Sequence, residues 1–170
     1  MLESLGNLGD FIGGLAVVVT LIYLATQLRQ HTEALRLEAR QRVAEGMRTH
    51  MRTRASIEDA TAWERGLREY PGIDSTDKHR FEGILADLTL LMQQIWALHE
   101  SGSLEDETYD GYLRFFLATI ATPGGRVWWE SRGRPIFIER MVADMDAKLA
   151  EGVTLDILEI ERSSGQPLGA

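Results

Sequence analysis

The sequence predicts an all-α protein in which a single N-terminal transmembrane helix continues into a cytoplasmic helical bundle. Residues 11–28 carry no charged side chain. Apolar residues then recur at helical spacings over most of the following 124 positions, and Pro and Gly interrupt that pattern at only a few places. We therefore divide the chain into an outward-facing N-terminus (1–10), a transmembrane helix (11–28), a cytoplasmic helical domain (29–152) and a C-terminal tail (153–170).

The apolar segment 11–28 has three possible interpretations. A cleaved signal peptide needs a basic start and a small-residue cleavage site, whereas this chain opens with MLESLGNLGD, which contains no Lys or Arg. A buried helix of a soluble bundle normally has one polar side, whereas this segment has none. Its large apolar residues go all the way round: Val17, Val18, Val19, Leu21, Ile22 and Leu24. Eighteen helical residues extend about 27 Å, close to the ~30 Å hydrocarbon core of a bilayer, so a membrane span is favoured.

The charges beside this segment predict its orientation. Residues 29–54 hold seven arginines against three glutamates, a net charge of +4, and no Lys or Arg precedes the segment. Because basic flanks remain on the cytoplasmic side, the N-terminus is expected outside and the body inside a bacterial inner membrane. Tyr23, near the inner end, suits the membrane interface.

The remaining chain reads as a series of amphipathic helices. The first helix continues to about Tyr70, with a break near Gly46 or Ser56, and Tyr70-Pro71-Gly72 ends it. A second helix is capped by Asp74 or Ser75 and closed by Ser101-Gly102. Later starts are predicted at Ser103 through a capping box with Asp106, at Thr122-Pro123, and at Pro135 for a helix that Gly152 ends. Residues 153–160 alternate as a short strand or an edge-binding tail would.

The string IGGLAVVVTLIYLATQLRQHTEALR resembles the start of a bacterial family of small membrane-anchored helical proteins of unknown activity. The shared signature runs IYLA-x-Q-[IL]-RQ-x-T-x-ALR, and His31 stands where the family pattern has Asn. A weaker likeness extends to PGGRVWWESRG, residues 123–133. The resemblance implies a membrane-anchored helical protein and no particular activity. The matching residues are Ile22, Tyr23, Leu24, Ala25, Gln27, Leu28, Arg29, Gln30, Thr32, Ala34, Leu35 and Arg36.

Composition and motifs argue against several function classes. Residues 55–170 hold 11 basic and 21 acidic side chains, which disfavours nucleic-acid binding. There is no cysteine and therefore no thiolate chemistry. The four histidines form no Glu-x-x-His pair; Met47, His50 and Met51 are conceivable soft ligands on one turn, but core packing is the better interpretation. No phosphate-binding or nucleophile motif is present, so we expect a non-enzymatic protein without a cofactor.

A few residues remain as candidates for function. Gly9, Gly13 and Gly14 offer a small-residue face for helix association, and Asp10 is a candidate ionisable group at the outer edge. Trp128 and Trp129 are a candidate interface: they either plug the bundle or lie against the membrane. Gly124 and Gly125 either permit a tight turn, which we favour, or receive an anion with Arg126. Glu105, Asp106 and Glu107 suit a helix start.

These features predict a membrane-anchored scaffold or accessory subunit. It would act through self-association or by binding a membrane-protein partner, with membrane lipid as its other contact. The alternative is an oligomeric membrane pore or sensor with Asp10 at its outer mouth.

Overall fold

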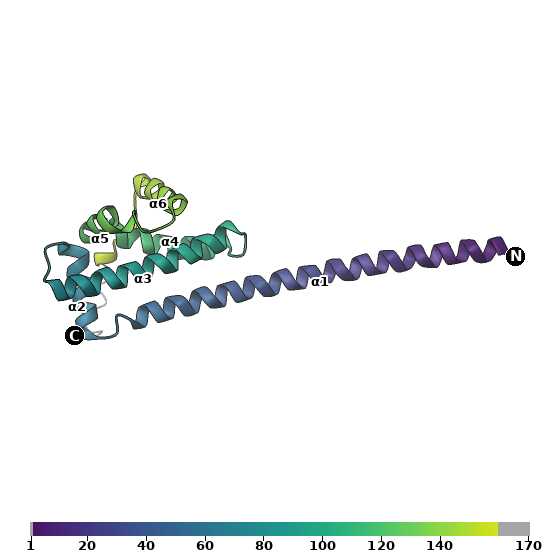
Figure 1. Cartoon of the computed structure of the whole chain (residues 1–170), viewed down its shortest axis with the longest axis horizontal. Coiled ribbons are helices and arrows are strands. Elements are labelled where there is room, and N and C mark those ends of the chain that lie inside the picture. Colours follow the sequence, from purple (N-terminus) through teal and green to yellow (C-terminus); the bar gives the residue numbers. More distant parts are fainter. Residues whose placement is uncertain (1, 160–170) are drawn as a thin grey trace. The chain divides into compact units, whose positions relative to one another are not determined.

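The computed structural model describes residues 2–159, and side chains from residue 13 onward; every regular element in that range is helical. The predicted all-α class is thus confirmed. The chain divides into two compact units, residues 1–39 and 40–170. Figure 1 shows the elements, which are α1 (Leu2–Arg52), α2 (Ile57–Glu69), α3 (Ser75–Glu100), α4 (Asp106–Ala121), α5 (Pro123–Trp128), the π-helix η1 (Trp129–Gly133) and α6 (Glu139–Glu151).

Helix α1 is continuous from Leu2 to Arg52 and supplies most of the first unit. It passes through Gly46 without a break and ends one turn before Ser56, so the second of the two predicted break points is the right one. Ser56 then caps α2, because its hydroxyl accepts a hydrogen bond from the Asp59 amide at 3.0 Å.

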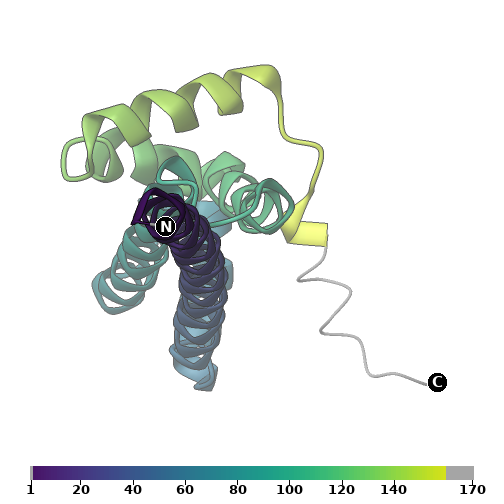
Figure 2. The ribbon, with the colours of Figure 1, turned by 90° about the vertical axis from the view of Figure 1, so that its right-hand side faces the viewer.

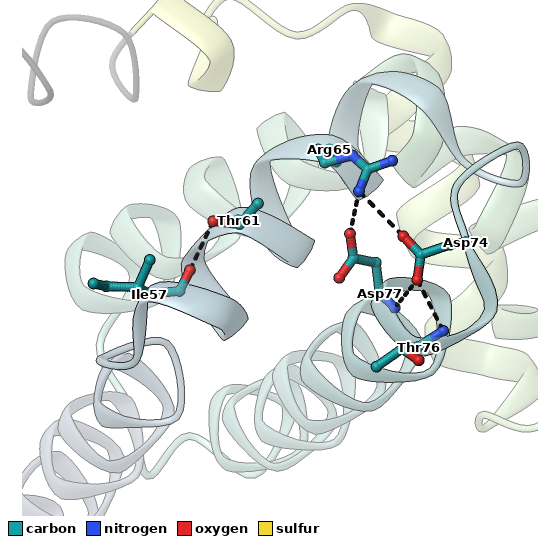
Figure 3. Close-up of polar contacts among 6 residues, drawn as sticks. All are labelled: Ile57, Thr61, Arg65, Asp74, Thr76 and Asp77. Carbon is teal, nitrogen blue, oxygen red and sulfur yellow. Dashed lines mark hydrogen bonds and ion pairs between the residues drawn. The ribbon is translucent and has the colours of Figure 1, made fainter.

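The turn between α2 and α3 is fixed by a cluster of polar contacts around Asp74 (Figure 3). The Asp74 carboxylate accepts hydrogen bonds from the amides of Thr76 and Asp77, both at 3.1 Å, and so caps α3 as predicted. The Arg65 guanidinium on α2 contacts the carboxylates of Asp74, at 3.1 Å, and of Asp77. These contacts hold the end of α2 beside the start of α3.

The second unit buries one continuous apolar core. Helix α2 packs on α3 and α5, and α4 packs on α3, α5 and α6. The largest fully buried side chains are Trp63, Trp128, Trp129, Phe81, Phe116, Leu67, Leu85, Leu88, Met92, Ile95, Ile120 and Met141. The predicted apolar faces of α3, α4 and α6 supply most of them, which explains why periodicity identified these helices.

Two predicted helix starts are wrong. Helix α4 begins at Asp106 with Glu105 as its N-cap, so Ser103 forms no capping box; Asp106 and Glu107 do lie in its first turn. Ser103 is instead occupied in closing α3, since its amide donates to the Leu98 carbonyl at 2.9 Å. Helix α6 begins at Glu139, four residues after Pro135, and ends at Gly152 as expected.

The described part of the C-terminal tail, residues 153–159, contains no strand, so that alternative is wrong there. The chain returns from the end of α6 in an extended segment and makes one helical turn at 157–159 (Figure 2). Ile157 is 3% exposed and belongs to the core, which explains the alternating apolar residues without a sheet partner. The prediction for residues 160–170 lies outside the described residues.

Candidate functional site: the apolar surface of α1

The most distinctive surface of the molecule is the first part of α1. Every side chain from residue 13 to residue 38 is exposed. The exposed fraction is 59% for Val17, 60% for Leu21 and 63% for Ile22. Tyr23 and Leu24 are 61% and 55% exposed and complete the circle with Val18 and Val19, so apolar side chains form a sleeve that covers the whole circumference and not a single stripe.

The polar groups inside this sleeve are satisfied within the helix. Thr20 donates its hydroxyl hydrogen to the Ala16 carbonyl at 2.8 Å, and Thr26 donates to the Ile22 carbonyl at 2.6 Å. The Gln27 side-chain amide donates to the Tyr23 hydroxyl at 3.2 Å. Such internal hydrogen bonds are what a helix needs where no water is available to bond its hydroxyls.

Within the part of the chain that the structure describes, no helix is both long and apolar enough to cross a membrane. Phe11 and Ile12, with which the predicted span begins, lie outside the described side chains, as do Gly9 and Asp10. The predicted roles of Gly9 in helix association and of Asp10 as an ionisable group therefore remain predictions.

Gly13 and Gly14 lie on an open part of α1. A Cβ added to either residue would have no heavy atom within 4 Å, apart from the helix's own backbone and immediate neighbours. Among the described residues neither glycine is needed for packing, so a second helix could approach closely at both positions.

Trp128 and Trp129 lie in the core and not on an exposed surface; their exposed fractions are 2% and 1%. The Trp129 ring meets Phe116 edge to face with centroids 5.9 Å apart, and its indole nitrogen donates to the Asp146 carboxylate at 2.9 Å. The first of the two interpretations, that the pair plugs the bundle, therefore describes this structure.

The two glycines before this pair serve close packing. A Cβ on Gly124 would lie 1.8 Å from the Gly66 carbonyl oxygen, and one on Gly125 would lie 2.2 Å from that of Thr119. The Gly125 amide already donates to the Thr122 hydroxyl at 3.1 Å, so it is occupied within the chain and the anion interpretation gains no support.

The three residues considered as soft metal ligands do not share a site. Met47 and Met51 line a groove together with Tyr112 and Phe115 of α4. His50 lies on another side of α1, where its Nδ1 is 2.7 Å from Asp87 Oδ2 on α3. No group of three or more His, Cys, Asp or Glu side chains able to hold a metal ion occurs among the described residues.

Asp144 on α6 is a second polar centre that sequence reasoning did not identify. It accepts hydrogen bonds from the Trp96 indole at 3.2 Å and from the Tyr109 hydroxyl at 3.5 Å, and it pairs with Lys148 at 3.9 Å. Burial, helped by the Asp144 charge, raises the pKa of Tyr109 well above its usual value, so the phenol remains a donor. One carboxylate thereby braces α3, α4 and α6. The sequence did contain a signal for this contact, because Asp144 lies beside the apolar face formed by Met141, Met145 and Leu149.

Comparisons with protein-family models, with curated proteins and with solved structures find no match for this chain.

Proposed function

We propose that the protein is a single-span membrane-anchored scaffold or accessory subunit without catalytic activity. The observation that carries this proposal is the apolar sleeve of α1, in which large aliphatic side chains are half or more exposed around the whole circumference. Water penalises apolar surface by roughly 25 cal/mol per Å², so such a sleeve calls for an apolar environment. Lipid supplies that environment in all directions, whereas a single partner helix covers only one side.

The proposed span is residues 11–28, which contain no charge. The first exposed ion pair follows directly, between Arg29 and Glu33 at 3.3 Å. Together with the net charge of +4 over residues 29–54, this supports a proposed membrane interface near Tyr23 to Arg29, with the acidic body in the cytoplasm.

The polar side chains of the body support a structural role. Asp87, Asp144 and Asp146 are engaged with partners on other elements, namely His50, Trp96 with Tyr109, and Trp129 with Arg134. Carboxylates used in this way stabilise the arrangement of the helices. A rigid helical body on an anchor suits a protein that presents a surface to a partner or to a second copy.

Two arginine substitutions at equally exposed positions test the anchor. Val19 and Leu37 are 58% and 55% exposed on the same helix, but only Val19 lies in the proposed span. Because an arginine at the centre of a transmembrane helix costs about 2.5–3.5 kcal/mol, we expect Val19→Arg to reduce membrane insertion about 100-fold. Leu37→Arg should leave insertion unchanged. The measurement is the fraction of full-length protein that stays in the membrane pellet after alkaline washing.

Equal loss of both variants from the pellet would contradict a lipid span, as would full release of the wild-type chain. The second result would favour a helix that associates with another protein through its sleeve.

Self-association through the small-residue face needs its own test. Since a side chain at Gly13 or Gly14 meets nothing within the chain, leucine at either position should not disturb the fold. If α1 helices pack together there, Gly13→Leu should lower the oligomer mass seen by native mass spectrometry in mild detergent. An unchanged homo-oligomer would place the contact elsewhere, and extra mass from another polypeptide would identify the partner of an accessory subunit.

A further inference from the structure

One buried histidine in the last turn of α1 contacts α3. The His50 side chain has no exposed area, and its Nδ1 lies 2.7 Å from Oδ2 of Asp87, whose own side chain is 55% exposed. The other ring nitrogen, Nε2, is buried without a hydrogen-bond partner. The Asp87 side of this contact is thus open to water, whereas Nε2 on the other side of the imidazole is buried.

This arrangement suits a neutral imidazole and disfavours a charged one. With its proton on Nδ1, the neutral ring donates to Asp87 and leaves only a lone pair at Nε2. Protonation would add a charged N–H at Nε2, where the protein supplies no acceptor, and an unpaired buried charge is costly. Burial accordingly lowers the pKa of His50 below 6.5, with a smaller contribution from the nearby Arg54 cation, while Asp87 opposes the shift.

Polar and charged side chains lie around the His50–Asp87 pair. A groove of about 530 Å³ runs beside the pair, lined by polar Thr49 and Gln94 and by half-exposed Leu90. The charged groups that line this groove are Arg42 and Glu45 on α1 and Asp87 on α3, and Arg54 follows the end of α1. Apolar contact between the helices is close at Gly46, where a Cβ would come within 2.7 Å of Leu91 Cδ1.

We propose that His50 and Asp87 form a pH-sensitive clasp that holds the end of α1 on α3 at neutral pH and releases it on acidification. The contribution of the neutral ring to docking is complete above pH 6.5, the value for an exposed histidine. This contribution is lost progressively as the pH falls below 6.5. The loss is complete once the pH is below the pKa that His50 has in the docked state. The clasp lies within the second unit and does not depend on the proposed membrane span.

The chain contains no cysteine, so a pair of spin labels can follow the clasp directly. Arg52→Cys on α1 and Gly83→Cys on α3 are exposed positions, and a side chain at Gly83 meets no neighbouring atom. In the full-length chain in mild detergent, we expect one narrow distance distribution at pH 7.5 and an added longer component at pH 5. His50→Gln keeps a donor for Asp87 but does not titrate, so the longer component should not appear at pH 5.

Two matched variants distinguish the clasp from general acid sensitivity. His99→Gln removes another histidine that pairs with a carboxylate, Asp106 at 3.0 Å, and should leave the response unchanged. Asp87→Asn removes the charge that raises the pKa of His50 in the docked state, so protonation should oppose docking more strongly and the longer component at pH 5 should grow. The proposal is overturned if the wild type shows no longer component, or if His50→Gln responds as the wild type does.

A nuclear magnetic resonance titration of the His50 ring in the wild-type chain covers the case in which His50→Gln does not fold. The ring should be neutral at pH 7, and its titration midpoint should coincide with that of the distance change. A ring that is already charged at pH 7, or a different midpoint, would refute the clasp.

Discussion

At the scale of single residues, Gly66 and Gly124 decide how closely two helices approach. The space for a Gly124 Cβ is already taken by the Gly66 carbonyl oxygen. Gly124 does not have a positive φ; among the described residues only Gly102 and Gly152 do. No left-handed backbone conformation therefore requires this glycine, and close packing of α5 on α2 accounts for it.

Alanine at position 124 should therefore destabilise the body. Moving α5 away from α2 to admit a methyl group disturbs a filled core, which typically costs about 1–3 kcal/mol. Gly111→Ala is the control, because a Cβ there meets nothing within 4 Å and alanine favours a helix by about 0.5–1 kcal/mol. Urea unfolding of the full-length variants should show opposite shifts of the midpoint; a neutral Gly124→Ala would mean that α5 adapts freely.

At the scale of secondary-structure elements, two predicted N-cap residues can be compared, one that caps a helix and one that does not. Asp74 accepts two amide hydrogen bonds at the start of α3, whereas Ser103 caps nothing. We expect Asp74→Ala to lower the free energy of unfolding by about 1 kcal/mol, and Ser103→Ala to change it by less than about 0.5 kcal/mol. Thermal unfolding followed by circular dichroism measures both. A larger loss for Ser103→Ala would show that Ser103 has a capping role after all.

Local sequence patterns predicted where helices exist but not always where they begin. The apolar spacing within α3, from Phe81 to Ile95, marks a buried face and is visible without any tertiary information. The start of α4 cannot be recognised in this way. Gly102, at φ +70°, turns the chain back, and the amides of Ser103 and Leu104 then donate to the Leu98 carbonyl. The sequence motif alone does not show that its residues already form hydrogen bonds with the end of the preceding helix.

The start of α6 and the π-helix η1 depend on distant partners in the same way. The Ile138 amide donates to the side chain of Gln93 on α3 at 3.1 Å, which helps to hold the chain out of a helix until Glu139. In η1, a Cβ on Gly133 would come within 2.6 Å of the Trp129 ring, so the wide turn fits around that side chain. The His50–Asp87 contact likewise joins two elements whose residues lie 37 positions apart, so no local pattern predicts it.

At the scale of the whole molecule, the charge asymmetry leads to a prediction of topology. Single cysteines at Ser4 and Ser131 can be labelled specifically, because the chain contains none. We expect a membrane-impermeant maleimide to modify Ser4→Cys in intact bacterial spheroplasts, and Ser131→Cys only after the spheroplasts are permeabilised. The reason is the excess of arginine after residue 28, which remains on the cytoplasmic side. Labelling with the opposite pattern would invert the proposed orientation.

The close approach of Gly66 and Gly124 also has a consequence for the order in which the chain folds. Helices α2 and α3 meet through a short turn, so their pairing closes only a small loop and can form early. The site on α2 that receives α5 stays uncovered until residues up to 128 have been synthesised, and α4 contacts α5 as well. In a nascent or truncated chain that stops before α5, Leu67 and the surface of α2 that packs on α5 would be exposed to water. The α2 surface is thus covered late in synthesis, and Met141, Met145 and Ile157 join the core later still.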